Sequence, residues 1–120
     1  MSKLFLYGIP NCDTVKKARV WLQEQGREFT FVDFKKIPPD AALLHSWLAQ
    51  AAHEQLINRK GTTWRGLSDD EKNAVCDAAS AASLMQHKPS VIKRPVLIDD
   101  GKLLALGFSA QQYAELFSAK

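Results

Sequence analysis

The stretch of sequence that decides the fold is residues 3–34, KLFLYGIPNCDTVKKARVWLQEQGREFTFVDF. Aromatic and branched residues fill Lys3–Tyr7, which predicts a short strand. From Asp13 the apolar residues recur at spacings of three and four, which predicts a helix that ends near Gly26. Residues 29–34 alternate between two faces and predict a second strand. A strand, a helix and a strand within about 30 residues form a βαβ unit, so we expect the two strands to be parallel.

The middle of the chain has a mostly helical pattern and forms a predicted insert of about residues 40–88. Pro38–Asp40 stops the second strand and opens a helix. Ser68–Glu71 is a capping box, because the serine side chain can accept from a free amide while the glutamate reaches back. We expect the helix that starts there to contain Cys76, and helical sequence to resume up to His87.

The end of the chain predicts a hairpin and a last helix. Val96–Ile98 and Lys102–Leu106 flank the turn sequence Asp99–Gly101, which is typical of an antiparallel β-hairpin. Ser109–Gln112 is a second capping box and opens a helix with Tyr113 on its inner face. The order β-α-β, helical insert, β-β-α predicts an α/β fold with a mixed four-stranded sheet and helices on its faces.

Length and composition fit one globular domain. With 120 residues, 46% apolar and 24% charged, the chain can bury a core without disulfides, and we expect a single domain over residues 1–120. The net charge of +3 is too small to indicate nucleic-acid binding. The apolar run Leu4–Tyr7 is too short for a signal peptide or a membrane helix. We therefore expect a cytoplasmic monomer without a membrane partner, with its thiols reduced.

Cys12 is the strongest candidate for chemistry. It follows a strand and a loop and precedes the first turn of a helix, where free amides and the helix dipole favour an anion. Lys16, one turn later, adds positive charge, whereas Asp13 opposes a second negative charge. We expect a reactive thiol that ionises more readily than a free cysteine.

The other cysteine and the histidines predict no further site. Cys76 lies far from any predicted helix start, so we interpret it as a small structural residue inside a helix. The residue three positions after Cys12 is Val15, which excludes a Cys-x-x-Cys dithiol at this loop. A redox cycle would then need a thiol from outside the chain. The three histidines form no cluster with the cysteines, so we expect no metal and no tightly bound cofactor.

Two cationic groups could bind an anion. Arg94–Pro95 stands at the head of a predicted strand, and an X–Pro bond is the kind that can be cis. Arg59, Lys60 and Arg65 lie together on the insert. Each group by itself is ordinary solvated charge, but beside Cys12 it would hold an anion.

Three segments together resemble the ArsC family. They are GIPNCDTVKKA at residues 8–18, LINRKG at residues 56–61 and PSVIKRPVLI at residues 89–98. The family comprises glutaredoxin-type arsenate reductases, Spx transcription regulators and YffB-type proteins, and the segment NCDTVKKA is most similar to the YffB-type branch. The resemblance covers nearly the whole chain.

The resemblance implies a thioredoxin-like (glutaredoxin-like) fold with a helical insert and a cis peptide bond before Pro95. In the family's arsenate reductases one cysteine attacks arsenate, glutathione and glutaredoxin regenerate it, and three arginines hold the oxyanion. Cys12 matches the nucleophile, and Arg59 and Arg94 match two of the arginines. The third would lie near residues 106–108, where this chain has no arginine. One missing charge-assisted contact costs about 1.5–3 kcal/mol, or one to two decades in affinity.

The residues and the resemblance leave three functions open. The first is a glutathione-dependent thiol–disulfide reductase in which Cys12 forms a mixed disulfide with glutathione, its co-substrate, while glutaredoxin and a small anionic or disulfide substrate are the other partners. The second is an arsenate reductase coupled to glutathione and glutaredoxin. The third is an Spx-like regulator that binds RNA polymerase, although the Spx switch is a Cys-x-x-Cys pair. The candidate binding residues for glutathione or substrate are Asn11, Lys16, Arg59, Arg94 and Pro95.

Overall fold

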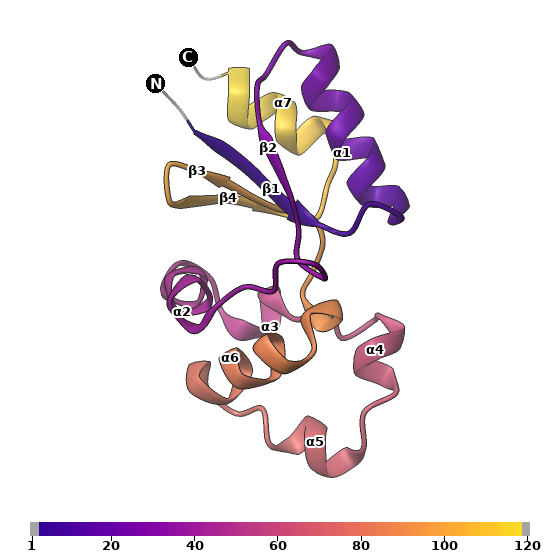
Figure 1. The fold of residues 1–120 in the computed structure, drawn as a ribbon, viewed down its shortest axis with the longest axis vertical. Helices are drawn as coiled ribbons and strands as arrows, with labels where there is room; N and C mark the ends of the chain where they lie inside the picture. Colours follow the sequence, from indigo (N-terminus) through magenta and orange to yellow (C-terminus); the bar gives the residue numbers. More distant parts are fainter. Residues whose placement is uncertain (1–2, 119–120) are drawn as a thin grey trace. The chain divides into compact units, whose positions relative to one another are not determined.

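The computed structural model describes residues 3–118, and their contacts divide them into two compact units (Figure 1). The sheet unit comprises residues 3–34 and 94–118, and the helical unit comprises residues 35–93. The insert expected at about residues 40–88 lies within the helical unit, and one domain over residues 1–120 stays a prediction. Within residues 3–118, no helix has both the length and the apolar character needed to span a bilayer.

The sheet unit contains a four-stranded mixed sheet. Its strands are β1 (Leu4–Gly8), β2 (Thr30–Asp33), β3 (Val96–Asp99) and β4 (Lys102–Leu106), in the order β2-β1-β3-β4. β1 pairs in parallel with β2, as the βαβ prediction requires, and antiparallel with β3, which forms the hairpin with β4. The predicted mixed sheet is confirmed.

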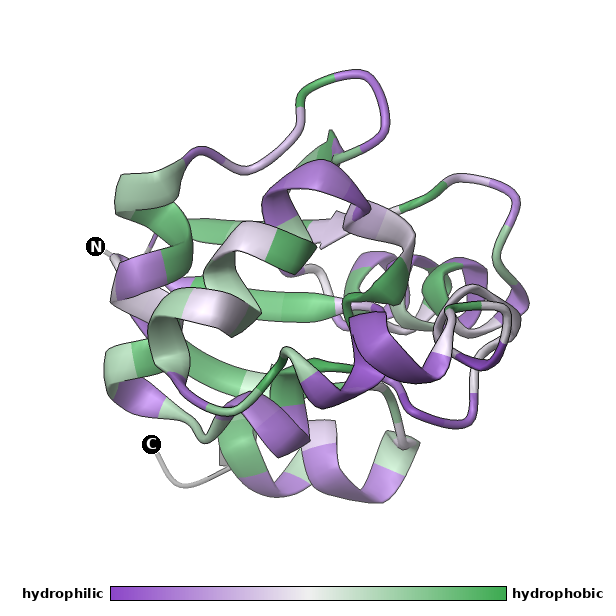
Figure 2. Cartoon of the chain, turned by 90° about the horizontal axis from the view of Figure 1, so that it is seen from below, coloured by the Kyte–Doolittle hydropathy of each residue, from purple (hydrophilic) through white to green (hydrophobic). Residues whose placement is uncertain are grey.

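Two helices of the sheet unit pack against the same face of this sheet. α1 (Asp13–Glu24) connects β1 to β2, and α7 (Ala110–Ser118) follows β4. Gly26 follows α1 with a φ of 68°, in the left-handed region that a glycine accepts without strain. Figure 2 shows hydrophobic colour concentrated in the strands and banded along the helices. The buried core between strands and helices consists of Leu4, Leu6, Ala18, Leu22, Leu97, Ala105 and Tyr113.

The helical unit is formed by short helices. α2 (Ala41–Gln50) packs against α6 (Ala78–His87), and their buried side chains include Leu44, Trp47 and Met85. An isolated antiparallel bridge pairs Ile57, in the middle of the unit, with Ile92, near its end. The elements of the unit are α2 (Ala41–Gln50), α3 (His53–Leu56), α4 (Thr62–Arg65), α5 (Asp69–Asn73), α6 (Ala78–His87) and the 3-10 turn η1 (Pro89–Val91).

The capping box at Ser68 is present, but the helix that it starts is shorter than predicted. The Glu71 N–H donates to Ser68 Oγ at 3.1 Å, and the Ser68 N–H donates to Glu71 Oε1 at 3.0 Å. These bonds, with the charge of Lys88, lower the pKa of Glu71. α5 nevertheless ends at Asn73.

The prediction that Cys76 is a structural residue inside a helix is wrong. Cys76 is exposed in the connection between α5 and α6. The physical reason is a second N-cap: the Asp77 carboxylate accepts from the Ser80 N–H at 2.8 Å, while Ser80 Oγ accepts from the Cys76 N–H at 3.0 Å. The alanine-rich pattern continues across this break, so periodicity alone did not reveal it.

Candidate active site

The candidate site lies at one end of the central strands of the sheet unit, where β1 ends and β3 begins. Tyr7 of β1 is opposite Val96 of β3 in the antiparallel register. The next pair along the same register brings Gly8 beside Pro95. The chain leaves β1 at this end of the sheet to form the loop of residues 9–12. The Cys12 loop and the Arg94–Pro95 segment therefore lie at the same end of the two central strands (Figure 1).

Cys12 is the N-cap residue of α1. Its φ of −100° and ψ of 124° are extended, and its carbonyl accepts the Lys16 N–H at 2.9 Å, the first bond of the helix. Its own N–H donates to the Ile9 carbonyl at 3.3 Å, which closes the loop as a turn. The thiol is half-buried and makes no side-chain cap bond. The sulfur therefore lies beside first-turn amides that have no acceptor within the helix, where the helix dipole favours an anion.

The neighbours of Cys12 on the loop and the first turn are polar and open to solvent. Asn11 and Asp13 are exposed on either side of it, and Lys16 is exposed one turn later. The residue at the position of a second redox cysteine is Val15, which is completely buried against the sheet. A disulfide within this loop is thus excluded by the side chain present, and an attacking or resolving thiol must come from outside the loop.

The Arg94–Pro95 peptide bond is cis, as the resemblance implies. Pro95 is buried and Arg94 is half-buried. The Pro95 carbonyl accepts the Gly107 N–H at 2.9 Å, so the segment after β4 is tied to the cis-proline segment. Gly107 has a φ of 76°, in the left-handed region, where a side chain would be strained by about 1–2 kcal/mol.

The backbone around Gly107 gives a physical reason why the third arginine expected near residues 106–108 is absent. Residues 106–108 are Leu106, Gly107 and Phe108, and none is charged. Phe108 is half-buried and packs edge-on against Tyr113, with ring centroids 4.7 Å apart. The position that a third arginine would take is occupied by core packing and a left-handed glycine.

Arg59 belongs to the helical unit, so its part in the site stays a prediction. It is exposed in the turn before α4, with its guanidinium 5.3 Å from the Trp64 ring centroid. The neighbouring Lys60 N–H donates to Asn58 Oδ1 at 3.2 Å. This local bonding fixes the turn that presents Arg59 within its own unit.

Sequence reasoning missed the part of Gly8 in positioning Cys12. A Cβ atom at Gly8 would lie 2.7 Å from Val15 Cγ2 and 3.2 Å from Val15 Cγ1. The absence of a side chain at Gly8 lets the first turn of α1 approach β1 closely. The only sequence signal is the glycine itself, which also ends the strand and therefore indicated nothing more.

Comparisons with known proteins agree with this geometry. The model of the ArsC family matches residues 7–116. Among solved structures, the YffB (PA3664) protein is 42% identical with a TM-score of 0.88, over 95% of this chain and 98% of the other. An arsenate reductase (ArsC) related protein from Brucella melitensis is 48% identical with a TM-score of 0.76, over 98% of this chain and 96% of the other.

Curated relatives give the same result. An uncharacterized protein of Haemophilus influenzae is 38% identical over 113 residues, which are 94% of this chain and 97% of that protein. The global transcriptional regulator Spx of Enterococcus faecalis is 28% identical over 91% of this chain and 82% of its own length.

The fold and the site together define a thioredoxin-like protein with one cysteine at the start of its first helix and a cis-proline at the same end of the sheet. The chain belongs to the ArsC family, as the sequence resemblance predicted.

Proposed function

We propose that this protein is a glutathione-dependent thiol–disulfide reductase that uses Cys12 as its single nucleophile. The observation that supports it is the half-buried Cys12 thiol at the N-cap of α1, without a side-chain cap bond and without a second cysteine in its loop. A thiol in that position is accessible to a small disulfide and lies beside first-turn amides that have no acceptor within the helix.

The proposed cycle has two thiol–disulfide exchanges. The Cys12 thiolate attacks the glutathione sulfur of a mixed disulfide between glutathione and a substrate thiol, so that a Cys12–glutathione disulfide forms and the substrate leaves as its thiolate, which takes a proton from water. A second glutathione thiolate then attacks the glutathione sulfur bound to Cys12, releasing oxidised glutathione and the Cys12 thiolate. Over the whole cycle, one glutathione thiol is consumed: the substrate leaves as a free thiol, its former glutathione partner and the second glutathione form oxidised glutathione, and the enzyme ends unchanged.

The charged residues at the site suit glutathione. Glutathione is a tripeptide with two carboxylates, and Lys16 and Arg94 of the sheet unit are its proposed partners because both are cationic and accessible near the Cys12 loop. Pro95 would contact the peptide backbone beside the sulfur, and Asn11 offers an exposed amide for hydrogen bonding. Arg59 is a proposed partner from the helical unit.

Turnover tests the proposal. The substrate is the mixed disulfide of glutathione and 2-mercaptoethanol, with reduced glutathione as reductant, and the product measured is oxidised glutathione. Wild type and Cys76→Ser should turn over at similar rates, whereas Cys12→Ser should show only the uncatalysed rate. Equal rates in Cys12→Ser and wild type, or loss of activity in Cys76→Ser alone, would refute the role of Cys12.

Arsenate reduction is the second candidate, because the 48% identical structure is an arsenate reductase related protein and because Cys12 and Arg94 lie at the same end of the central strands. Against it stands the uncharged segment of residues 106–108. Arsenate, glutathione and glutaredoxin should give little turnover above a Cys12→Ser control. A rate comparable to that with the glutathione mixed disulfide would reverse the order of the two candidates.

Transcriptional regulation is the third candidate, because Spx proteins are among the relatives. The buried Val15 takes the place of the second switch cysteine, so we rank this function below the two enzymes. A pull-down with the RNA polymerase α subunit should recover nothing, and specific recovery would favour the regulator.

A further inference from the structure

The outer edge of β2 is an open strand edge. β2 ends the sheet order β2-β1-β3-β4, so only one of its sides pairs with another strand of the sheet unit. The Phe34 N–H, directly after β2, donates to the Gly8 carbonyl of β1 at 3.0 Å. Because backbone groups of a strand alternate in direction, Thr30 and Val32 also turn toward β1, while the N–H and C=O groups of Phe29 and Phe31 turn outward.

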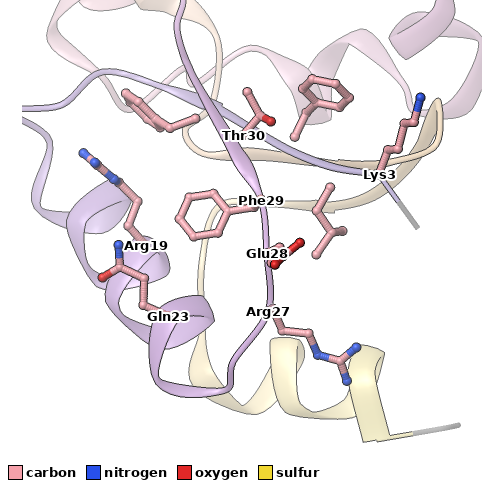
Figure 3. Close-up of a pocket in the computed structure, with 10 residues that line it drawn as sticks. Lys3, Arg19, Gln23, Arg27, Glu28, Phe29 and Thr30 are labelled. Atoms are coloured by element: carbon pink, nitrogen blue, oxygen red, sulfur yellow. The ribbon is translucent and has the colours of Figure 1, made fainter. Parts of the chain in front are cut away.

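A wide groove of about 800 Å³ follows this edge, entirely within the sheet unit. Figure 3 shows β2 and the residues before it running through the middle of the groove, with Arg19 and Gln23 of α1 on one side and Lys3 on the other. The aromatic ring of Phe29 lies on the α1 side. The groove therefore offers side chains on both sides of an unpaired backbone edge.

The charge of the groove is positive. Its ionisable residues are Lys3, Arg19, Arg27 and Glu28, which sum to +2 from three cations and one anion. Packing holds two of the cations in place. The Arg19 guanidinium lies 4.4 Å from the Phe31 ring centroid, and that of Arg27 lies 4.5 Å from the Phe117 ring centroid and donates to the Phe117 carbonyl at 3.3 Å.

The cations at the two sides of the groove are not neutralised by the protein itself. Among residues 3–118, neither Lys3 nor Arg19 forms an ion pair, and the pairs of His53 with Glu54 and of Lys88 with Glu71 belong to the helical unit. Both side chains are thus available to an anionic group from outside.

We propose that the β2 edge binds an extended acidic segment of a partner protein by strand addition. The backbone of the added segment would pair with Phe29 and Phe31. Because side chains of a strand alternate between its two faces, carboxylates on one face of the segment would meet Arg19 and carboxylates on the other face would meet Lys3. A second copy of this chain is a poorer occupant, since its edge would bring another +2 groove against the first. Charged residues at an edge also discourage accidental pairing, so a partner must supply the opposite charge.

The proposal goes beyond the chemistry of Cys12 and is tested separately from it. The probe is a fluorescent octapeptide, EVTEVTEV, with blocked ends, whose glutamates fall on both faces of an extended chain. Its controls are KVTKVTKV and a version of the first peptide with alternate backbone amides methylated, which removes hydrogen bonding along one edge. Binding is measured by fluorescence anisotropy, and the bound edge is located by amide hydrogen exchange.

The variant pair is matched in charge. Lys3→Glu combined with Arg19→Glu reverses both sides of the groove, and Lys17→Glu combined with Lys102→Glu makes the same change in net charge at exposed residues that do not line it. We expect the first pair to weaken EVTEVTEV binding at least about fivefold and the second to change it less than twofold. Backbone methylation should weaken binding about tenfold. Cys12→Ser should bind like wild type.

Amide exchange gives the residue-level result. On binding, the Phe31 N–H should exchange more slowly, while the Val32 N–H, already paired with β1, should change little. The proposal would be overturned by equal affinity for the glutamate and lysine peptides, by equal loss in the two variant pairs, or by slowed exchange outside the groove. Concentration-dependent protection of Phe31 without peptide would instead show that a second copy occupies the edge.

Discussion

Substituting Gly8 by alanine should move the first turn of α1, which holds Cys12. The added Cβ would lie 2.7 Å from Val15 Cγ2, closer than carbon atoms approach without displacement. Val15 is completely buried and β-branched, so on a helix it has one favoured rotamer and cannot turn away. The Gly8 carbonyl is bonded to the Phe34 N–H at 3.0 Å on its other side, which holds β1 in place. The helix therefore has to yield.

The magnitude follows from two opposing effects. Overpacking a buried contact costs about 1–3 kcal/mol of unfolding free energy. Replacing glycine by alanine restricts the unfolded chain and returns about 0.4–1 kcal/mol. We expect Gly8→Ala to lower the free energy of unfolding by about 1–2 kcal/mol, which corresponds to roughly 4–8 °C in Tm for a chain of this length.

A double-mutant cycle isolates the contact. Val15→Ala alone removes two buried carbons and should cost about 2–3 kcal/mol. Combined with Gly8→Ala, the new methyl enters the vacated space, so the double variant should be at least about 1 kcal/mol more stable than the sum of the single effects predicts. Val20→Ala is the control, because Val20 lies on the same helix with 50% of its surface exposed and should be additive with Gly8→Ala.

The assay is urea unfolding followed by circular dichroism, together with the alkylation rate of Cys12 at one fixed pH in a Cys76→Ser background. The alkylation rate should change in Gly8→Ala and return toward that of the parent in the double variant. Unchanged stability in Gly8→Ala, or strict additivity with Val15→Ala, would refute the close-approach account of this loop.

Two further predictions concern polar groups away from the loop. The Tyr113 hydroxyl is buried without a hydrogen-bond partner among residues 3–118, and its burial raises the pKa of the phenol. Tyr113→Phe removes this unpaired polar group, so it should increase the free energy of unfolding by about 1 kcal/mol in the same urea assay. A decrease would mean that the hydroxyl is hydrogen-bonded. The bonds from Ser80 lower the pKa of the Asp77 carboxyl, so its cap stabilises the fold above the unfolded pKa near 3.9 and is lost as the pH falls through the lower folded value. Wild-type stability should thus fall more steeply with acid than that of Asp77→Asn, and parallel acid profiles would contradict the assignment.

The strands and the helix starts were predictable because their signals are local. Aromatic and branched residues indicated β1, alternation indicated β2, and the Asp-Gly turn indicated the hairpin. The capping box at Ser109 is present, with its side chain accepting the Gln112 N–H at 3.0 Å. The end of α5 was not predictable in the same way. Whether the chain continues or restarts near Cys76 depends on the competing cap at Asp77, and an alanine-rich stretch is compatible with both.

The candidate site was likewise predictable from the sequence only in part. Cys12 could be identified from the order strand, loop, helix, because that order alone places a residue at a helix N-terminus. The cis bond before Pro95 came from the family resemblance. The fit of Gly8 against Val15, and the hydrogen bond between Gly107 and Pro95, depend on contacts between different segments that only folding brings together, and no local pattern contains them.

The most direct test of the central claim is a competition between the two cysteines for oxidised glutathione, read by peptide mass analysis at early times. Cys76 is exposed and Cys12 is half-buried, so accessibility alone would favour Cys76. The account predicts that glutathione appears first on Cys12, in wild type and in Cys76→Ser alike, and that added reduced glutathione removes it. Modification of Cys76 with Cys12 left unmodified would contradict it.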